Sequence, residues 1–444
     1  MTDQLLTASR STSPTAVGER LRRLRIARGM TQSEVANGRF TKEYVSQIER
    51  GRVRPTVETI EWLADRLEVS RSYIETGVSS EESERAAGLV LRAEAAITSS
   101  DYEEALLCLQ GLAESLRGWH PELELRALLA ESTARTHRGE LDAALALLER
   151  ATDLADGTVF TDLDRARVFF HFGRCRYKLA SISTAIGLFS EALDLVRRSG
   201  LSDDRLVSST LRWRSRCYRR QRDWVAARED VEQALELAEG LGDRRAMAHS
   251  YFQASIIAER NGQWILARSH AERAKALYEE HDDRLNVGRL LNNLGGLQFL
   301  LGKPDEAVTL LKEAFTVAIE VDSEADAAQA VSSLAQVHLR SGDVLQAEEQ
   351  ARHALTLLEG RVDFLDEIGN AQLVLGRALL QQEKLGEAEE AFAAAESAYA
   401  QMSSGSHQAA AWTAQAELAI RRGEQDKALA LYRRAAETLQ DVRF

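Results

Sequence analysis

The sequence predicts an all-α fold, in which a small helical head precedes a long series of stacked helix pairs. Three observations lead to this prediction. The 444 residues are dominated by good helix formers, with only 4 prolines and 6% aromatic residues. Apolar residues in the head recur with helical spacing. Small residues in the remainder recur about every 40 positions. This composition argues against an all-β protein or a parallel-sheet enzyme.

Charge divides the chain into two parts. The net charge is -13 at pH 7, yet the first 77 residues carry +3 and the remainder carries -16. A mildly basic head and an acidic body confine any nucleic-acid binding to the head.

These changes of composition place the domain boundaries. We expect a disordered N-terminus over 1–15, a head domain over 16–77, a linker over 78–86 and a repeat domain over 87–444. The polar run TGVSSEESER, residues 76–85, fits either a short linker or the first turn of a new helix.

Cysteine usage and hydropathy indicate a cytoplasmic protein. The three cysteines form no CxxC pair, so they predict neither a disulfide framework nor a thiolate metal site. The N-terminus lacks the charged start and apolar run of a signal peptide, and no later window is long and apolar enough to cross a membrane. We therefore expect a soluble protein without membrane contact.

The head begins with two short helices. Val17, Leu21 and Leu24 share one helical face and predict the first helix. Thr31 is expected to cap the second helix, because Glu34 follows three residues later in the capping-box position.

Two further helices are expected in the head, which holds four or five helical segments in all. Thr41 is expected to cap a third helix over 42–49, which buries Val45 and Ile48 and exposes its polar residues. A fourth helix is expected over 55–67. A bundle of this size is too small to be an enzyme.

The run TQSEVANGRFTKEYVSQIERGRVRPTVETIEWLADRLEVS, residues 31–70, resembles the helix-turn-helix domain of Cro and phage-repressor type. The resemblance implies that the third helix enters the major groove of duplex DNA. Lysine suits guanine, glutamine suits adenine and glutamate suits cytosine, so this helix has the chemistry to read bases. The alternative is a solvated charged helix used for protein contacts. The implied base-facing residues are Lys42, Glu43, Ser46 and Gln47, and the implied backbone contacts are Gln32, Arg50, Arg52 and Arg54.

The body repeats three columns of small residues. Small side chains at fixed positions allow helices to pack closely, because backbones approach only where side chains are short. The first column is Ala105, Ala144, Ala185, Ala227, Ala267, Ala307, Ala347, Ala388 and Ala428. The second lies seven residues later, as Ala151, Ala192, Ala234, Ala274, Ala314, Ala354, Ala395 and Ala435, with Leu112 as the one exception in the first repeat. The third lies twelve residues earlier, as Ala93, Ser132, Gly173, Ser215, Ser255, Gly295, Ala335, Gly376 and Ala416.

This register resembles the tetratricopeptide repeat over residues 85–440. The resemblance implies about nine helix pairs, A and B, stacked as a right-handed α-solenoid. It also implies that one face of each A helix lines a concave groove. The last B helix is expected over 427–439.

The implied groove face gathers cations and amides, which predicts a short peptide or another anionic ligand. The alternative is structural: arginines near helix C-termini complement the helix dipole and pair with glutamates of neighbouring B helices. The candidate ligand-binding residues are Arg167, His171, Arg174, Tyr177, Lys178, Arg212, Arg216, Arg219, Arg220, Gln253, Arg289, Asn292, Asn293, Gln336, Asn370 and Arg377.

No pattern of catalytic or metal-binding residues accompanies these features. The nine histidines show no HExxH or paired metal spacing, and Cys175 and Cys217 occupy equivalent repeat positions expected to be core thiols. We therefore expect no enzymatic activity, no metal and no cofactor.

A repressor-like head joined to such a body resembles the peptide-pheromone transcription regulators of Gram-positive bacteria. The resemblance implies a homodimer that binds an inverted repeat in duplex DNA and senses a short peptide, with asparagines holding the peptide backbone. The alternative function is an interaction scaffold that sequesters a partner protein and uses the head only for docking.

Overall fold

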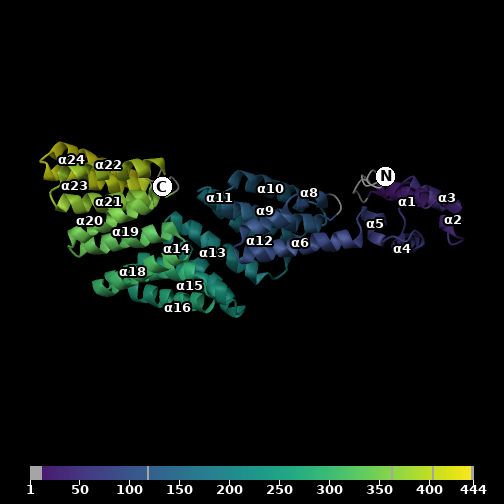
Figure 1. The fold of residues 1–444 in the computed structure, drawn as a ribbon, viewed down its shortest axis with the longest axis horizontal. Helices are drawn as coiled ribbons and strands as arrows, with labels where there is room; N and C mark the ends of the chain where they lie inside the picture. Colours follow the sequence, from purple (N-terminus) through teal and green to yellow (C-terminus); the bar gives the residue numbers. More distant parts are fainter. Residues whose placement is uncertain (1–12, 118–119, 362–363, 403–404, 442–444) are drawn as a thin grey trace. The chain divides into compact units, whose positions relative to one another are not determined.

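The computed structural model describes residues 13–117, 120–361, 364–402 and 405–441, and every regular element among them is a helix. The chain divides into two compact units, Met1–Cys217 and Tyr218–Phe444, which are described separately. The expected all-α fold is confirmed (Figure 1).

The head contains five short helices. Thr31 caps α2 with the expected capping box, and Thr41 caps α3 by accepting a hydrogen bond from the Tyr44 amide at 3.1 Å. The fourth helix begins later than expected, because Thr56 caps it and leaves Pro55 outside. The helices are α1 (Pro14–Ala27), α2 (Gln32–Ala36), α3 (Lys42–Glu49), α4 (Val57–Arg66) and α5 (Arg71–Thr76).

One apolar cluster holds these helices together. Leu21 from α1, Val45 and Ile48 from α3, and Leu63 from α4 are buried within it. Gly18 of α1 lies directly against the last turn of α3, where a Cβ atom would come within 2.2 Å of the Ile48 carbonyl oxygen. The absence of a side chain at Gly18 therefore sets how closely α1 approaches α3.

At both ends of the head, helices begin inside segments that were expected to be disordered or a linker. Residues 1–12 of the N-terminus expected to be disordered lie outside the described residues, while Ser13 caps α1 and residues 14 and 15 belong to that helix. Ser79 caps α6 with a capping box to Glu82, so most of the segment 78–86 is helical. The polar run after the head is thus the start of a helix, and the division into domains remains our proposal.

The described part of the body holds nine helix pairs and one additional short helix, α8 (Figure 1). In the first unit the helices are α6 (Ser80–Thr98), α7 (Tyr102–Leu109), α8 (Leu112–Leu116), α9 (Pro121–Arg138), α10 (Leu141–Ala155), α11 (Asp162–Lys178) and α12 (Ile182–Ser199). The helix α13 (Asp204–Arg220) contains the division between the units. In the second unit they are α14 (Trp224–Gly240), α15 (Arg244–Arg260), α16 (Trp264–Glu280), α17 (Arg284–Leu300), α18 (Pro304–Glu320), α19 (Glu324–Arg340), α20 (Val344–Leu357), α21 (Leu365–Gln381), α22 (Leu385–Gln401), α23 (Gly405–Arg421) and α24 (Gln425–Asp441).

The small residues lie where the two helices of a pair meet. All nine alanines of the first column are buried. A Cβ atom on Gly376 of α21 would lie 2.4 Å from the Phe392 ring of α22, and one on Gly173 of α11 would lie 2.6 Å from the Phe189 ring of α12. The regular spacing in the sequence therefore reflects close contact between paired helices. Cys108, Cys175 and Cys217 are free, buried thiols.

The turn inside each helix pair contains one residue in the left-handed conformation, always five positions before the first-column alanine. Glycine occupies this position in five turns, for example Gly262 with φ of +73°. Ser100, Ala180, Arg222 and Glu383 adopt the same conformation in the other four, with φ between +57° and +64°. The turn geometry is thus common to all nine pairs, whichever residue occupies it.

Glu348 of α20 connects this helix to the turn between α21 and α22 in the second unit. Its carboxylate accepts hydrogen bonds from Arg352 at 2.9 Å, from Gln382 at 2.7 Å and from Lys384 at 3.0 Å. Burial raises the pKa of Glu348, but these three donors outweigh burial and lower the pKa to about 2. The ionised carboxylate therefore stabilises the contact between α20 and the turn after α21.

Replacing Glu348 by glutamine is expected to lower the free energy of unfolding of the second unit by about 2 kcal/mol at pH 7. Because folding lowers the pKa of this group, its contribution is complete above pH 4.5 and is lost as the pH falls to about 2. Urea unfolding of both proteins from pH 7 to pH 2.5 should show the difference shrink. Glu349→Gln, at an exposed neighbour, should match the native protein throughout; a pH-independent difference for Glu348→Gln would contradict this account.

Candidate functional site

The outer face of α3 carries the residues expected to read DNA bases. Val45 and Ile48 are fully buried and fix the helix against the head core. This orientation leaves Lys42, Glu43 and Gln47 exposed, while Ser46 is half-buried beside them. The structure thus brings the four predicted base-facing residues to one helix, and three of them are exposed.

Three arginines continue this surface beyond the C-terminus of α3. Arg50, Arg52 and Arg54 are all exposed. Within the described part of the chain, neither these arginines nor Lys42 pairs with an acidic group. Uncompensated cations next to an exposed polar helix form the arrangement that neutralises DNA phosphates.

Gln32 has a second partner that the sequence did not predict. Its amide nitrogen donates a hydrogen bond to Glu49 at 2.7 Å, and the same carboxylate accepts from Arg25 at 2.6 and 3.1 Å. This buried network holds α1 and α2 against the end of α3. A contact between Gln32 and DNA phosphate therefore remains a prediction, and Gln32 has a positioning role in addition.

Arg20 is another residue whose role the sequence did not reveal. Its side chain is almost fully buried, and its Nε atom donates to the carbonyl oxygen of Ile74 at 3.0 Å. This bond ties α1 to the end of α5. Burial lowers the pKa of Arg20.

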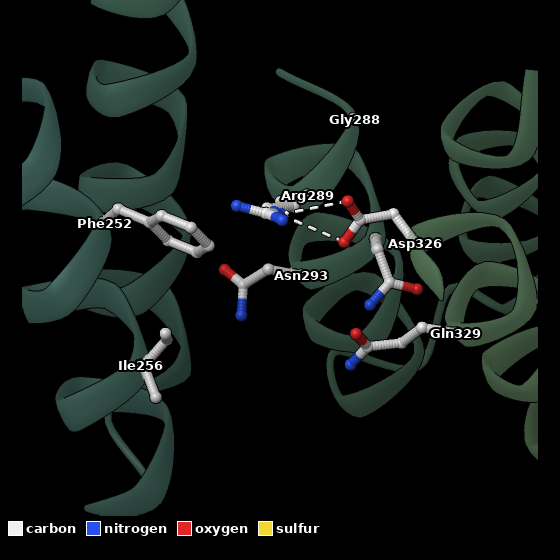
Figure 2. A pocket seen from close by; sticks show the side chains of 8 residues that line it. Phe252, Ile256, Gly288, Arg289, Asn293, Asp326 and Gln329 are labelled. Carbon is white, nitrogen blue, oxygen red and sulfur yellow. Dashed lines mark hydrogen bonds and ion pairs between the residues drawn. The ribbon is translucent and has the colours of Figure 1, made fainter. Parts of the chain in front are cut away.

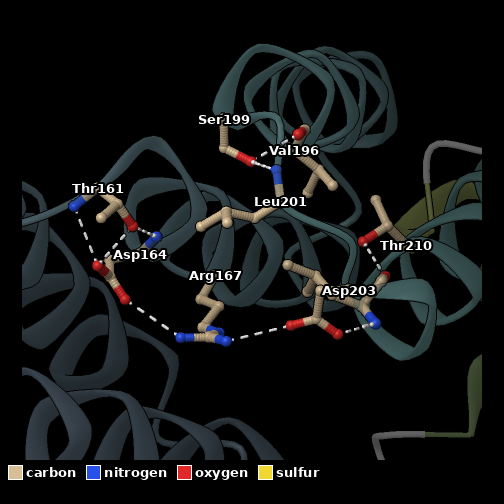
Figure 3. A network of polar contacts seen from close by, with 9 residues as sticks. Thr161, Asp164, Arg167, Val196, Ser199, Leu201, Asp203 and Thr210 are labelled. Atoms are coloured by element: carbon tan, nitrogen blue, oxygen red, sulfur yellow. Dashed lines mark hydrogen bonds and ion pairs between the residues drawn. The ribbon is translucent and has the colours of Figure 1, made fainter.

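In the body, two arginines expected to bind an anion are already paired with aspartates. Arg167 of α11 lies 3.1 Å from both Asp164 and Asp203 (Figure 3). Arg289 of α17 pairs with Asp326 of α19 at 3.0 Å (Figure 2). The expected accumulation of uncompensated charge is therefore wrong at these two positions. The partners are aspartates at or just before the start of A helices, rather than glutamates of B helices.

Arg174 differs from these two residues. Its Nη2 atom lies 2.7 Å from Nε2 of His137, and its Nε atom is buried without a hydrogen-bond partner. The guanidinium lies over the rings of Phe170 and Trp213, at 5.7 and 5.3 Å from their centroids. No acidic group in the described residues pairs with it.

Other candidates on α11 and α13 contact the Trp213 ring or other side chains. Arg216 lies 4.8 Å from the centroid of the same Trp213 ring, and Tyr177 packs edge-on against that ring. His171 shares a hydrogen bond of 2.9 Å with Thr133. Arg212 donates to Ser209 at 3.3 Å, and Lys178 is exposed.

The asparagines of the second unit are not equivalent. The amide group of Asn293 donates to Glu259 at 3.1 Å and accepts from Ser255 at 3.2 Å. The amide group of Asn370 likewise donates to Asp366 at 3.1 Å and accepts from Tyr399 at 2.9 Å. Both of these amides are therefore engaged within the protein.

A hollow of about 220 Å³ lies between α15, α17 and α19, with Phe252 and Gln329 in its lining (Figure 2). Asn292 also lines it, and its side-chain oxygen is buried without a partner. Gln253 is also buried, and its side-chain oxygen also has no partner. Among the candidate ligand-binding amides in the described residues, Asn292 and Gln253 therefore have an unused acceptor. The other candidates of this unit are Arg219 and Arg377, which are half-buried, and Arg220 and Gln336, which are exposed.

Sequence reasoning missed a second hollow, of about 370 Å³, in the first unit. It brings His171, Arg167 and Arg174 of α11 together with residues of α6 and α9. The missed lining residues occupy the same face of the A helices in the first two repeats, so extending the register to those repeats would have found them. They are Glu94, Ile97, Arg126, Leu129, Ala130 and Thr133.

The described residues contain no group of three histidine, cysteine or acidic side chains placed to hold a metal ion. Within those same ranges, no helix has the length and hydropathy needed to cross a membrane.

Comparison with known families and proteins identifies both parts of the chain. The Helix-turn-helix domain family matches residues 16–76. One Tetratricopeptide repeat family matches residues 206–280, 244–320 and 286–360, and another matches residues 333–403 and 373–441. An uncharacterised HTH-type transcriptional regulator of Sinorhizobium fredii, y4dJ, is 46% identical over 61 residues, which make up 14% of this chain and 79% of that protein.

Solved structures share the fold of the body. A Rap protein complexed with Competence and Sporulation Factor has a TM-score of 0.62 at 17% identity, covering 81% of this chain and 99% of that one. The apo form of the quorum sensor NprR from B. thuringiensis has a TM-score of 0.60 at 13% identity, covering 80% and 99%. This chain therefore belongs to the helix-turn-helix family of transcriptional regulators, with the DNA-binding type of head joined to a body of tetratricopeptide repeats.

Proposed function

We propose that this regulator binds an inverted repeat in duplex DNA as a cytoplasmic homodimer and changes its DNA binding when the body binds a ligand. The observation that carries the proposal is the exposed face of α3 together with the unpaired cations Lys42, Arg50, Arg52 and Arg54. A single small head neutralises few phosphates. Specific affinity at physiological salt therefore requires two heads on half-sites about one helical turn apart.

Replacing Gln47 by alanine is expected to weaken specific binding about tenfold and to relax the preference for one sequence, because a bidentate base contact is lost. Arg52→Ala should instead weaken binding to all sequences and reduce the salt dependence, because a phosphate contact is lost. Footprinting and gel-shift titrations at two salt concentrations would separate the two effects. Failure of the native protein to protect any DNA near its own gene would favour the scaffold function.

The proposed ligand of the body is a short peptide or another anionic molecule. Support comes from the unused amide oxygens of Asn292 and Gln253 and from the cationic surroundings of Arg174. The structural relatives include a Rap protein in complex with Competence and Sporulation Factor and a protein named a quorum sensor. A ligand that prefers one conformation of the body would shift the population of dimers able to bind DNA.

Dimerisation is proposed to use the last repeat. The side chain of Trp412 is buried with Ala435, and Ala416 is buried with Ala428, so these apolar residues are already packed inside the repeat. Leu429, Tyr432 and Leu439 remain exposed along α24, at spacings of three and seven residues that place them on one helical face. This face is the proposed contact with the second copy.

The double variant Leu429→Glu, Tyr432→Glu is expected to be monomeric, because charge on this face opposes burial in a dimer. Light scattering at several protein concentrations would measure the mass. Leu345→Glu, at an exposed residue of α20, serves as a control and should remain dimeric. A dimer that survives the double change would place the interface elsewhere.

A further inference from the structure

A pocket of about 370 Å³ opens between α6, α9 and α11 in the first unit. Its volume lies within the range of small-molecule sites, roughly 300–1,000 Å³. The apolar part of its lining consists of Ile97, Leu129 and Ala130, and its polar part includes Thr133, His171 and Arg174. We refer to it as the Arg174 pocket.

Two of the three arginines in the Arg174 pocket are neutralised. Arg126 donates two hydrogen bonds to Glu94, at 3.0 and 2.7 Å. Arg167 pairs with Asp164 and Asp203 (Figure 3). Only Arg174 carries a charge that no acid of the described residues balances.

The surroundings of Arg174 make this charge costly. Phe170 and Trp213 flank the guanidinium, and the Nε atom is shielded from water without a partner. Burial, reinforced by the charge of Arg216, lowers the pKa of Arg174 to about 10, so the side chain is still charged at pH 7. Arg174 is half-buried, with its Nε atom shielded, and such a cation without a counter-charge gains from an anion that binds beside it.

The nearby histidines add hydrogen-bonding groups but no charge. Burial, and next the charge of Arg174, lower the pKa of His171 to about 3 and that of His137 to about 4. Both rings are therefore neutral at pH 7. The pocket thus combines one positive charge with an apolar surface, which suits one carboxylate attached to an apolar group.

Resting on the proposed ligand-sensing function, we propose that the Arg174 pocket binds a carboxylate joined to an apolar side chain, as found at the C-terminus of a peptide. A free apolar carboxylic acid has the same chemistry. Arg174 grips the carboxylate through its planar guanidinium, and Ile97, Leu129 and Ala130 contact the apolar group. This assignment makes Arg174, rather than Arg167 or Arg289, the anion-binding residue of the body.

Two pools of N-acetyl hexapeptides, random except for a final leucine, test this proposal. One pool ends in a free carboxylate and the other in an amide. Mass spectrometry of the peptides retained by the full-length protein after ultrafiltration should show at least a tenfold preference for the free acids. Arg174→Gln should abolish the preference, Arg174→Lys should keep part of it, and Arg197→Gln, at an exposed arginine of α12, should leave it unchanged. Equal retention of both pools, or an unchanged preference in Arg174→Gln, would overturn the proposal.

Octanoate as a competitor identifies the source of the carboxylate. Displacement of the retained peptides would indicate that a free apolar acid suffices, and persistence of the peptides would indicate a peptide terminus. Thermal unfolding provides a readout independent of ligand: Arg174→Gln should melt at the native temperature or higher, because an uncompensated, half-buried charge is removed. A lower melting temperature would contradict the uncompensated charge.

DNA binding separates this proposal from the proposed regulator function. Without ligand, Arg174→Gln should bind DNA as tightly as the native protein. If the native protein itself bound no DNA, the regulator function would fail independently of the Arg174 pocket.

Discussion

Alanine at position 18 is expected to destabilise the head by about 3 kcal/mol and to lower DNA affinity at least tenfold. The new Cβ atom would lie 2.2 Å from the Ile48 carbonyl oxygen and 2.8 Å from that of Glu49. Both are backbone atoms at the end of α3, so a change of side-chain rotamer cannot relieve the clash. Either α1 or α3 must move, and α3 carries the residues proposed to read DNA.

Gly88→Ala provides the matched control, since a Cβ atom on this helical glycine of α6 meets nothing within 4 Å. It should leave DNA binding unchanged and raise stability by about 0.5–1 kcal/mol. Gel-shift titration and urea unfolding would measure both variants. Native DNA affinity in Gly18→Ala would mean that α1 and α3 separate without disturbing the DNA-binding surface.

Removing the carboxylate of Glu49 is expected to cost the head about 3–5 kcal/mol, because Glu49→Ala leaves the cation of Arg25 buried without its partner. The side chains of Arg25 and Glu49 are only 13% and 3% exposed, and the hydrogen bond to Glu49 is the largest cause of the raised pKa of Arg25. Gln32 loses its hydrogen-bond acceptor in the same variant. Urea unfolding of the head, followed by its tryptophan fluorescence, would measure the loss.

Glu61→Ala offers a control for the loss of an ion pair. Glu61 pairs with Arg71 at 3.0 Å, but the two side chains are 54% and 42% exposed. Removing it should cost no more than about 1 kcal/mol. The double variant Arg25→Met, Glu49→Met should recover part of the stability lost in Glu49→Ala, because no buried charge remains. Equal losses in Glu49→Ala and Glu61→Ala would contradict the proposed network.

The fold could be predicted because the helix-capping residues and the repeat of small residues about every 40 positions both indicate packed helices. Thr31 and Thr41 cap helices through groups three residues away, so the sequence alone defines those boundaries. The column of alanines and Gly173 marks contacts between the two helices of one pair, which the short turn brings together. The start of the fourth helix was misplaced, because both Pro55 and Thr56 are suited to a helix start and Thr56 forms the cap. The helix that begins at Ser80 in the expected linker, and the short helix α8, were not predicted either.

The polar contacts of the candidate site were harder to predict. Arg167 and Asp203 are 36 residues apart, and Arg289 and Asp326 are 37 apart. Whether such an ion pair forms depends on how far one A helix is shifted along its axis relative to the next. The spacing of small residues in the sequence does not give this shift. The same limit applies to Glu49 and Gln32, whose bond depends on the angle between two short helices. The residue types therefore predicted which helix faces carry the candidate sites. They did not predict which arginines are neutralised by acidic side chains.

The left-handed turns also bear on how such a body changes during evolution. An L-residue in this conformation costs roughly 1–2 kcal/mol relative to glycine. Arg222 and Glu383 nevertheless adopt it, because the helices on both sides of the turn hold it in place. Mutation away from glycine thus lowers stability at a single turn, and it is tolerated as long as the helix contacts offset this cost. Sequence searches that rely on turn glycines would then lose repeats whose structure has not changed.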